Sequence, residues 1–87
     1  MVRNGDLVAV FHSVHRVMEA EKILKAAGAD ILLIPVPRQL SSDCGLAIRY
    51  ASAEKAAVTA VLRDKGLLPA ELYVREDEGF VQLSLEA

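Results

Sequence analysis

The order of strand-like and helix-like segments is the strongest constraint on the fold of these 87 residues. Short, uninterrupted apolar runs predict strands, whereas longer segments with apolar residues three and four positions apart predict helices. In chain order, the segments predict strand, helix, strand, strand, helix, strand and strand. The expected ranges are 7–11, 14–27, 31–34, 46–50, 53–65, 71–75 and 81–85.

This order is most simply satisfied by an α+β fold, the ferredoxin-like βαββαβ sandwich, in which two helices cover one face of an antiparallel sheet. The usual strand order of that sandwich is 4-1-3-2, and the fifth strand is expected to extend the edge beside the fourth. We predict a single domain over residues 1–87. The composition, 53% hydrophobic and 25% charged, is typical of a folded globular chain.

Each helix has recognisable end signals and a predicted buried stripe. Ser13 is expected to cap the first helix and Gly28 to end it in a left-handed conformation, and Ser52 and Gly66 are expected to play these parts for the second. In the first helix, the stripe is Val17, Ala20, Leu24 and Ala27. In the second, it is Ala53, Ala56, Ala57, Ala60 and Val61.

Residues 35–45 are predicted to form a structured loop at the edge of the sheet. Pro35 and Pro37 lock their own φ angles and lack backbone donors, so they end the preceding strand. The loop carries Cys44, the only cysteine in the chain. One cysteine cannot form an internal disulfide, and the chain begins with no signal-type segment, so we expect a reducing, cytoplasmic location.

The predicted topology brings Cys44 close to residues more than 25 positions away in the sequence. The end of strand one, the start of helix one and the loop share one edge, which places His12 and Ser13 beside the thiol. A helix N-terminus or a nearby histidine lowers the pKa of a thiol, and the thiolate is the nucleophile. Arg38 adds positive charge to this loop, whereas Asp43 opposes it.

Each of these residues also has a plainer interpretation. Lone cysteines are most often small buried hydrophobic residues, although the polar neighbours of Cys44 argue against burial. His12 can cap a backbone group at the strand end, and Ser41 and Ser42 can simply be turn residues. Gly45 can serve a special backbone conformation or a close backbone approach.

Zinc binding is a further alternative that we weigh and do not favour. The ligands would be His12, His15, Cys44 and Asp43. Three-residue spacing places two histidines together on a helix, but His12 precedes the predicted helix. We therefore predict neither a metal nor a cofactor.

Charge and hydropathy exclude two classes of partner. The net charge of −2 gives no electrostatic footprint for nucleic acid. No apolar run approaches the ~20 residues that span a bilayer. The strands at 7–11 and 31–34, however, offer apolar residues to both faces of the sheet. Because an exposed apolar face is unusual in a monomer, we expect a homodimer or a partner docked on the face without helices.

Several motifs resemble those of the Se/S carrier protein-like family, a set of short bacterial proteins. The resemblance extends over roughly residues 6–75, and the Pro-x-Pro-Arg…Ser-Ser-x-Cys-Gly loop is its most specific part. The segments that carry it are Phe11-His12-Ser13 before a helix containing Ala20-Glu21-Lys22, Ile34-Pro35-Val36-Pro37-Arg38, and Ser41-Ser42-Asp43-Cys44-Gly45-Leu46-Ala47. The family name implies that the cysteine carries a sulfur or selenium atom.

The resulting functional hypothesis is a carrier that receives the chalcogen from a donor protein and passes it to an acceptor protein. Cys44 would hold the atom as a persulfide or selenosulfide, and His12 would orient or tune the thiol. Ser13, Arg38, Ser41, Ser42, Asp43 and Gly45 are the expected binding residues. Such a protein is a carrier, or resembles a sulfurtransferase, rather than a turnover enzyme. The alternative is a regulatory small-molecule-binding or protein-interaction module of ferredoxin-like fold without cysteine chemistry.

Overall fold

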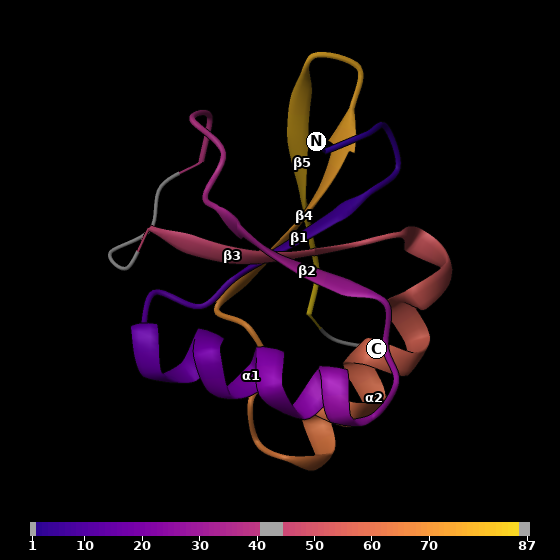
Figure 1. Ribbon diagram of the computed structural model, residues 1–87. Coiled ribbons are helices and arrows are strands. Elements are labelled where there is room, and N and C mark those ends of the chain that lie inside the picture. Colours follow the sequence, from indigo (N-terminus) through magenta and orange to yellow (C-terminus); the bar gives the residue numbers. More distant parts are fainter. Residues whose placement is uncertain (1, 41–44, 86–87) are drawn as a thin grey trace.

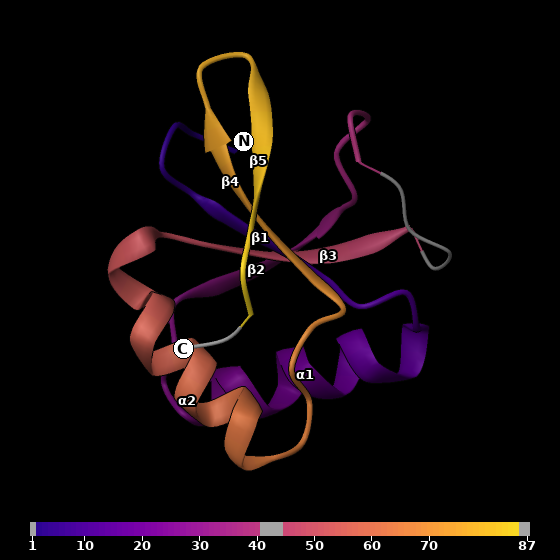
Figure 2. The same cartoon turned by 180° about the vertical axis from the view of Figure 1, so that it is seen from behind.

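The structure is a computed structural model that describes residues 2–40 and 45–85. In this part of the chain, two α-helices pack on one face of a five-stranded antiparallel sheet (Figures 1 and 2). The elements are β1 (Leu7–Val10), α1 (Val14–Ala26), β2 (Ile31–Pro35), β3 (Leu46–Tyr50), the short 3₁₀ helix η1 (Ser52–Glu54), α2 (Lys55–Asp64), β4 (Glu71–Glu76) and β5 (Gly79–Leu83).

The strands stand in the order β2-β3-β1-β4-β5, and all neighbours are antiparallel. Read from the other edge, the order is β5-β4-β1-β3-β2. Strands β1 to β4 thus stand in the order 4-1-3-2, and β5 lies beside β4. The predicted α+β class is confirmed, and the arrangement is compatible with a ferredoxin-like sandwich. β5 spans Gly79–Leu83, which is the expected length but begins two residues earlier than the predicted range 81–85, so Leu85 lies beyond its end.

The first helix follows its sequence signals closely. The Ser13 side chain accepts a hydrogen bond from the backbone N–H of Arg16, as an N-cap does. Gly28 has a φ of +82°, the left-handed conformation that ends the helix. Of the predicted stripe, Val17, Ala20 and Leu24 are buried, whereas Ala27 is exposed.

The second helix corrects two predictions. Ser52 does not cap it, because the chain enters through η1 and no side chain caps either η1 or α2. The alanines predicted to face the sheet, Ala53, Ala56, Ala57 and Ala60, are exposed. Val58 and Leu62 are buried instead. Burying a valine or leucine side chain stabilises the fold by about 1.5–3 kcal/mol, more than an alanine can, and this sets the rotation of the helix.

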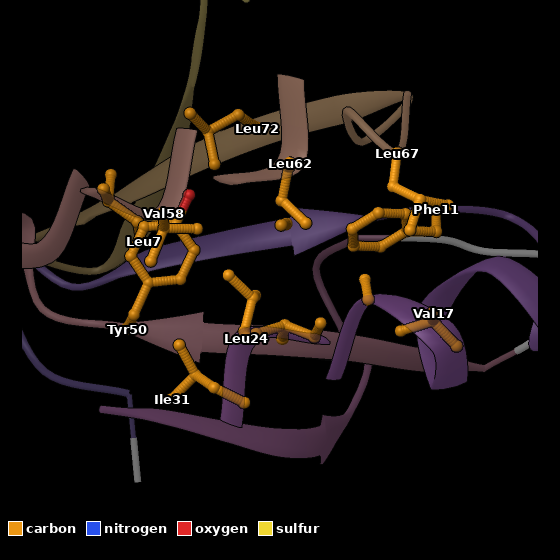
Figure 3. Close-up of a cluster of buried hydrophobic side chains, with 13 residues drawn as sticks. Leu7, Phe11, Val17, Leu24, Ile31, Tyr50, Val58, Leu62, Leu67 and Leu72 are labelled. Atoms are coloured by element: carbon orange, nitrogen blue, oxygen red, sulfur yellow. The ribbon is translucent and has the colours of Figure 1, made fainter. Parts of the chain in front are cut away.

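The main core lies between the helices and the sheet (Figure 3). Leu24 of α1 and Leu62 of α2 meet residues of β1 and β3 there, including Leu7 and Tyr50. Each of these four residues is at most 2% exposed. This packing holds the end of β1 and the start of α1 in fixed positions.

The face without helices is largely covered by the chain itself, in contrast to the expected open apolar surface, although Leu32 on this face is 44% exposed. Val8, Val10 and Ala47 are completely buried on it, in a second cluster with Ile34. Partly buried side chains from the N-terminal segment, the residues after β2 and the β4–β5 hairpin cover this cluster: Val2, Val36, Leu40, Tyr73 and Phe80. The open-face argument for a homodimer therefore fails, although the dimer itself is not tested by this packing.

Candidate functional site

Four segments meet where β1 ends. Val10 pairs with Ala47 of β3 and with Glu71 of β4, so the start of each of these strands lies beside the end of β1. The first turn of α1 follows at once (Figure 1). The end of β1, the start of α1 and the start of β3 thus lie at one edge, as the predicted shared edge requires. Residues 41–44 of the loop that was predicted to share this edge lie outside the described residues.

His12 occupies the turn between β1 and α1 in an unusual backbone conformation. Its φ is +59°, in the left-handed region that non-glycine residues seldom adopt. Histidine is one of the residues more often found there, and the strain is of order 1 kcal/mol. Such strain is concentrated at functional sites, so the conformation of His12 supports its candidacy as a site residue.

The imidazole of His12 is held by an acidic residue that the sequence analysis missed. Nε2 of His12 lies 3.4 Å from Oε2 of Glu71, and both side chains are about one-third exposed. The second oxygen of Glu71 accepts a 2.9 Å hydrogen bond from the hydroxyl of Tyr73. Burial, the Glu71 hydrogen bond and the Glu71 charge all raise the pKa of Tyr73, which therefore stays a donor. The result is a polar chain from Tyr73 through Glu71 to His12, and it orients the imidazole.

Two polar residues at the start of α1 form hydrogen bonds, one within the helix and one to the chain just after α2. The Ser13 hydroxyl is 3.3 Å from the Arg16 amide and acts as a cap. The Arg16 guanidinium donates a hydrogen bond to the carbonyl of Gly66, so the chain just after the second helix also reaches this edge. His15 is exposed on the helix surface.

Arg38 lies elsewhere. It is exposed and lines a shallow hollow of about 370 Å³ with Arg75 and Phe80, which belong to the hairpin that covers the helix-free face. The segment after β2 rises away from α1 in Figure 1. The structure therefore does not bring Arg38 together with Ser13.

Gly45 is the end of the loop that the structure describes. Its φ is +73°, a conformation that glycine adopts without strain, and its carbonyl accepts a 2.9 Å hydrogen bond from the amide of Val36. This bond fixes the base of the loop to the edge of the sheet. The predicted site residues Ser41, Ser42, Asp43 and Cys44 lie outside the described residues.

The described part of the chain contains neither a metal-ligand cluster nor a membrane-spanning helix. Residues 2–40 and 45–85 contain no group of three or more histidine, cysteine or acidic side chains close enough to hold one ion. Two members of the zinc alternative, Asp43 and Cys44, fall outside these ranges, so that alternative is not tested. Neither helix in these ranges has the length and apolar character needed to cross a bilayer.

The chain resembles a known family over most of its length. Residues 6–74 match the model of the family described as "Putative Se/S carrier protein-like". Comparison with curated proteins and with solved structures gave no match.

Proposed function

We propose that this chain, which belongs to the Se/S carrier protein-like family, carries a sulfur or selenium atom on Cys44 and passes it to an acceptor. The residues that match the family, 6–74, include the end of β1, the start of α1 and the loop that carries Cys44. The carrier hypothesis assigns the chemistry to the only thiol in the chain. It requires a donor protein and an acceptor protein as partners, in a reducing compartment such as the cytosol.

The observation that carries the proposal is the oriented His12 imidazole at the edge where the cysteine loop is anchored. Glu71 holds Nε2 of His12 at 3.4 Å, and the residues before β3 leave the sheet at the same edge, because Val10 of β1 pairs with Ala47 of β3. Cys44 directly precedes Gly45 in the sequence. In the proposed site, the thiol would lie near enough to His12 and to the first turn of α1 for both to favour a thiolate.

The loading step is a thiol–disulfide-type exchange and needs no external oxidant. The Cys44 thiolate attacks the outer sulfur of a donor persulfide, R–S–SH. The new bond joins Cys44 to that sulfur, the donor S–S bond breaks, and the donor leaves as a thiolate. Delivery is the same exchange with the acceptor as the nucleophile, and a selenosulfide forms in the same way from an R–S–SeH donor.

The remaining loop residues would stabilise the loaded anion. Ser41 and Ser42 supply hydroxyl donors on the approach to Cys44, and Gly45 leaves space for the backbone to come close. Asp43 would disfavour the anion while it is charged and so favour release. Ser13 would contribute through the helix start that it caps, whereas the position of Arg38 gives it no support as a thiol partner.

Two finer points complete the proposal. The sheet order and the single helical layer support a ferredoxin-like scaffold with β5 as an added edge strand. A homodimer remains a prediction without the open-face argument, and its test is sedimentation equilibrium at micromolar concentration. A 9.4 kDa species throughout would exclude stable self-association.

The reactivity of the sole thiol tests the site directly. We expect alkylation of the native protein to follow an apparent pKa below the ordinary cysteine value of ~8.5, because His12 and the start of α1 favour the thiolate. The measurement is the alkylation rate between pH 5 and pH 10, followed by intact mass. Slow alkylation with an apparent pKa at or above ~8.5 would contradict an activated thiol.

Substitution of each histidine in turn distinguishes the effect of an oriented imidazole at His12 from that of any histidine near the start of α1. His12→Asn is expected to slow alkylation at pH 7 about tenfold, which corresponds to a thiol pKa about one unit higher. Asparagine also tolerates the left-handed backbone, so this variant tests the imidazole rather than the turn. The matched control, His15→Asn, lies on the exposed surface of α1 and should react like the native protein.

If His12→Asn keeps its circular dichroism spectrum and reacts at the native rate, His12 has no part in the site. Glu71→Gln keeps the shape of the side chain but removes the charge that holds Nε2. It should give an intermediate rate, because Glu71 acts only through the orientation of His12.

A further inference from the structure

A second candidate site lies at the other end of β3. A half-open cavity of about 510 Å³ lies between α2, the start of β4 and the residues that follow β5. Its walls are mostly apolar, with Leu62, Leu68, Pro69 and Leu72 among them. The exposed alanines Ala53 and Ala56 line it too, and their small side chains leave this space open beside the helix. Pockets of roughly 300–1,000 Å³ with apolar walls and a few polar groups are typical of small-molecule sites.

One polar group in the lining of the cavity is the hydroxyl of Tyr50, a residue that is 2% exposed. Figure 3 shows the ring rising from β3 with the oxygen next to Val58 of α2. Burial raises the pKa of Tyr50 to about 12, so the hydroxyl stays protonated and is a donor. No buried side-chain nitrogen or oxygen atom in residues 2–40 and 45–85 lacks a hydrogen-bond partner, so the role of this hydroxyl is that of a donor at the cavity wall. A ligand that enters the cavity with an acceptor atom can accept its hydrogen bond.

The charged residues that line the cavity are both cations. Lys55 and Arg63 lie two turns apart on α2, which is about 12 Å along the axis. Neither forms an ion pair with any other residue in the described ranges. Glu54, the neighbour of Lys55, does not line the cavity, and its carboxylate lies 3.4 Å from the amide of Asp30. The charge of the lining thus favours an anionic head group.

We propose that this cavity binds a small amphipathic carboxylate of the medium-chain fatty-acid class. The apolar chain lies against Leu62 and Leu68, and the carboxylate accepts a hydrogen bond from Tyr50 and pairs with Lys55. These two residues belong to the same end of the cavity, since Tyr50 ends β3 and Lys55 begins α2 five residues later. The Cys44 loop precedes the opposite end of β3, so this site is separate from the proposed carrier site and goes beyond it.

Titration calorimetry with three probes of equal chain length tests the proposal. Decanoate carries the anionic head group, decanol is its neutral counterpart, and decyltrimethylammonium is cationic. Decanoate is expected to bind at least tenfold more tightly than either of the other two. Cys44→Ala should leave decanoate binding unchanged, which keeps this result independent of the carrier chemistry.

Tyr50→Phe is the decisive variant, because it removes the hydroxyl and keeps the buried ring. It should weaken decanoate binding about tenfold, and Lys55→Gln should weaken it several-fold. The matched control is Tyr73→Phe, whose hydroxyl bonds to Glu71 away from the cavity and whose loss should change nothing. Absence of decanoate binding, equal binding of decanol, or native affinity in Tyr50→Phe would each overturn the proposal.

Discussion

Leu24→Ala is expected to lower the free energy of unfolding by about 3 kcal/mol. Leu24 is completely buried where α1 meets the sheet, and truncation of a buried leucine removes its transfer free energy and leaves a cavity. A domain of this size is stabilised by about 5–10 kcal/mol, so the variant should lose a large part of its stability. Urea denaturation followed by circular dichroism measures the change in midpoint at an unchanged slope.

Met18→Ala is the matched control for this prediction. Met18 lies on the same helix, six residues before Leu24, but its side chain is 44% exposed. Its truncation should change the free energy of unfolding by no more than about 0.5 kcal/mol. Equal losses in the two variants would show that the packing of α1 against the sheet is not as described.

The order of the elements and the first helix could be predicted because several local signals agree there. Ser13, the spacing of Val17, Ala20 and Leu24, and Gly28 all indicate the same helix, and the structure contains it. Short strands separated by helices then leave few ways to form one antiparallel sheet. The observed order, β2-β3-β1-β4-β5, is one of them.

The buried face of the second helix could not be predicted from the spacing of its small residues. Alanine is frequent in α2 on several sides, so a stripe of alanines does not mark the sheet-facing side. The larger residues Val58 and Leu62 determine which side of α2 faces the sheet, because their burial contributes more free energy than that of alanine. The exposed alanines Ala53 and Ala56 are instead what keeps the cavity beside the helix open.

The cover of the helix-free face was missed for a different reason. Val2, Val36 and Leu40 are single apolar residues in irregular segments, and no periodicity marks them as buried. Their contact with the sheet depends on the path of the chain between elements. The hydrophobic pattern of the strands therefore indicated correctly that both faces of the sheet are apolar. It could not indicate that irregular segments of the chain pack on the face without helices.

Glu71 was accessible to prediction, in contrast. In the order 4-1-3-2, the start of strand four must lie beside the end of strand one, and Glu71 is the first residue of that strand. The same reasoning that placed His12 near the loop would have placed an acidic residue near His12. Tyr73 follows two positions later on the same face, which allows its hydroxyl to reach Glu71.

Complete loss of chalcogen loading is the expected result of Cys44→Ala. The native chain has one thiol, so any added sulfur or selenium atom must be held there. His12 and the start of α1 should also make loading faster than at an ordinary cysteine. A peptide of residues 38–50 contains the same cysteine without the sheet edge and is the control for intrinsic reactivity.

The most direct measurement is the intact mass of the protein during incubation with glutathione persulfide at pH 7. We expect a gain of one sulfur atom per native chain, reached at least tenfold faster than in the peptide. No gain is expected in Cys44→Ala. A native protein that gains no sulfur, or gains it no faster than the peptide, would contradict the carrier function.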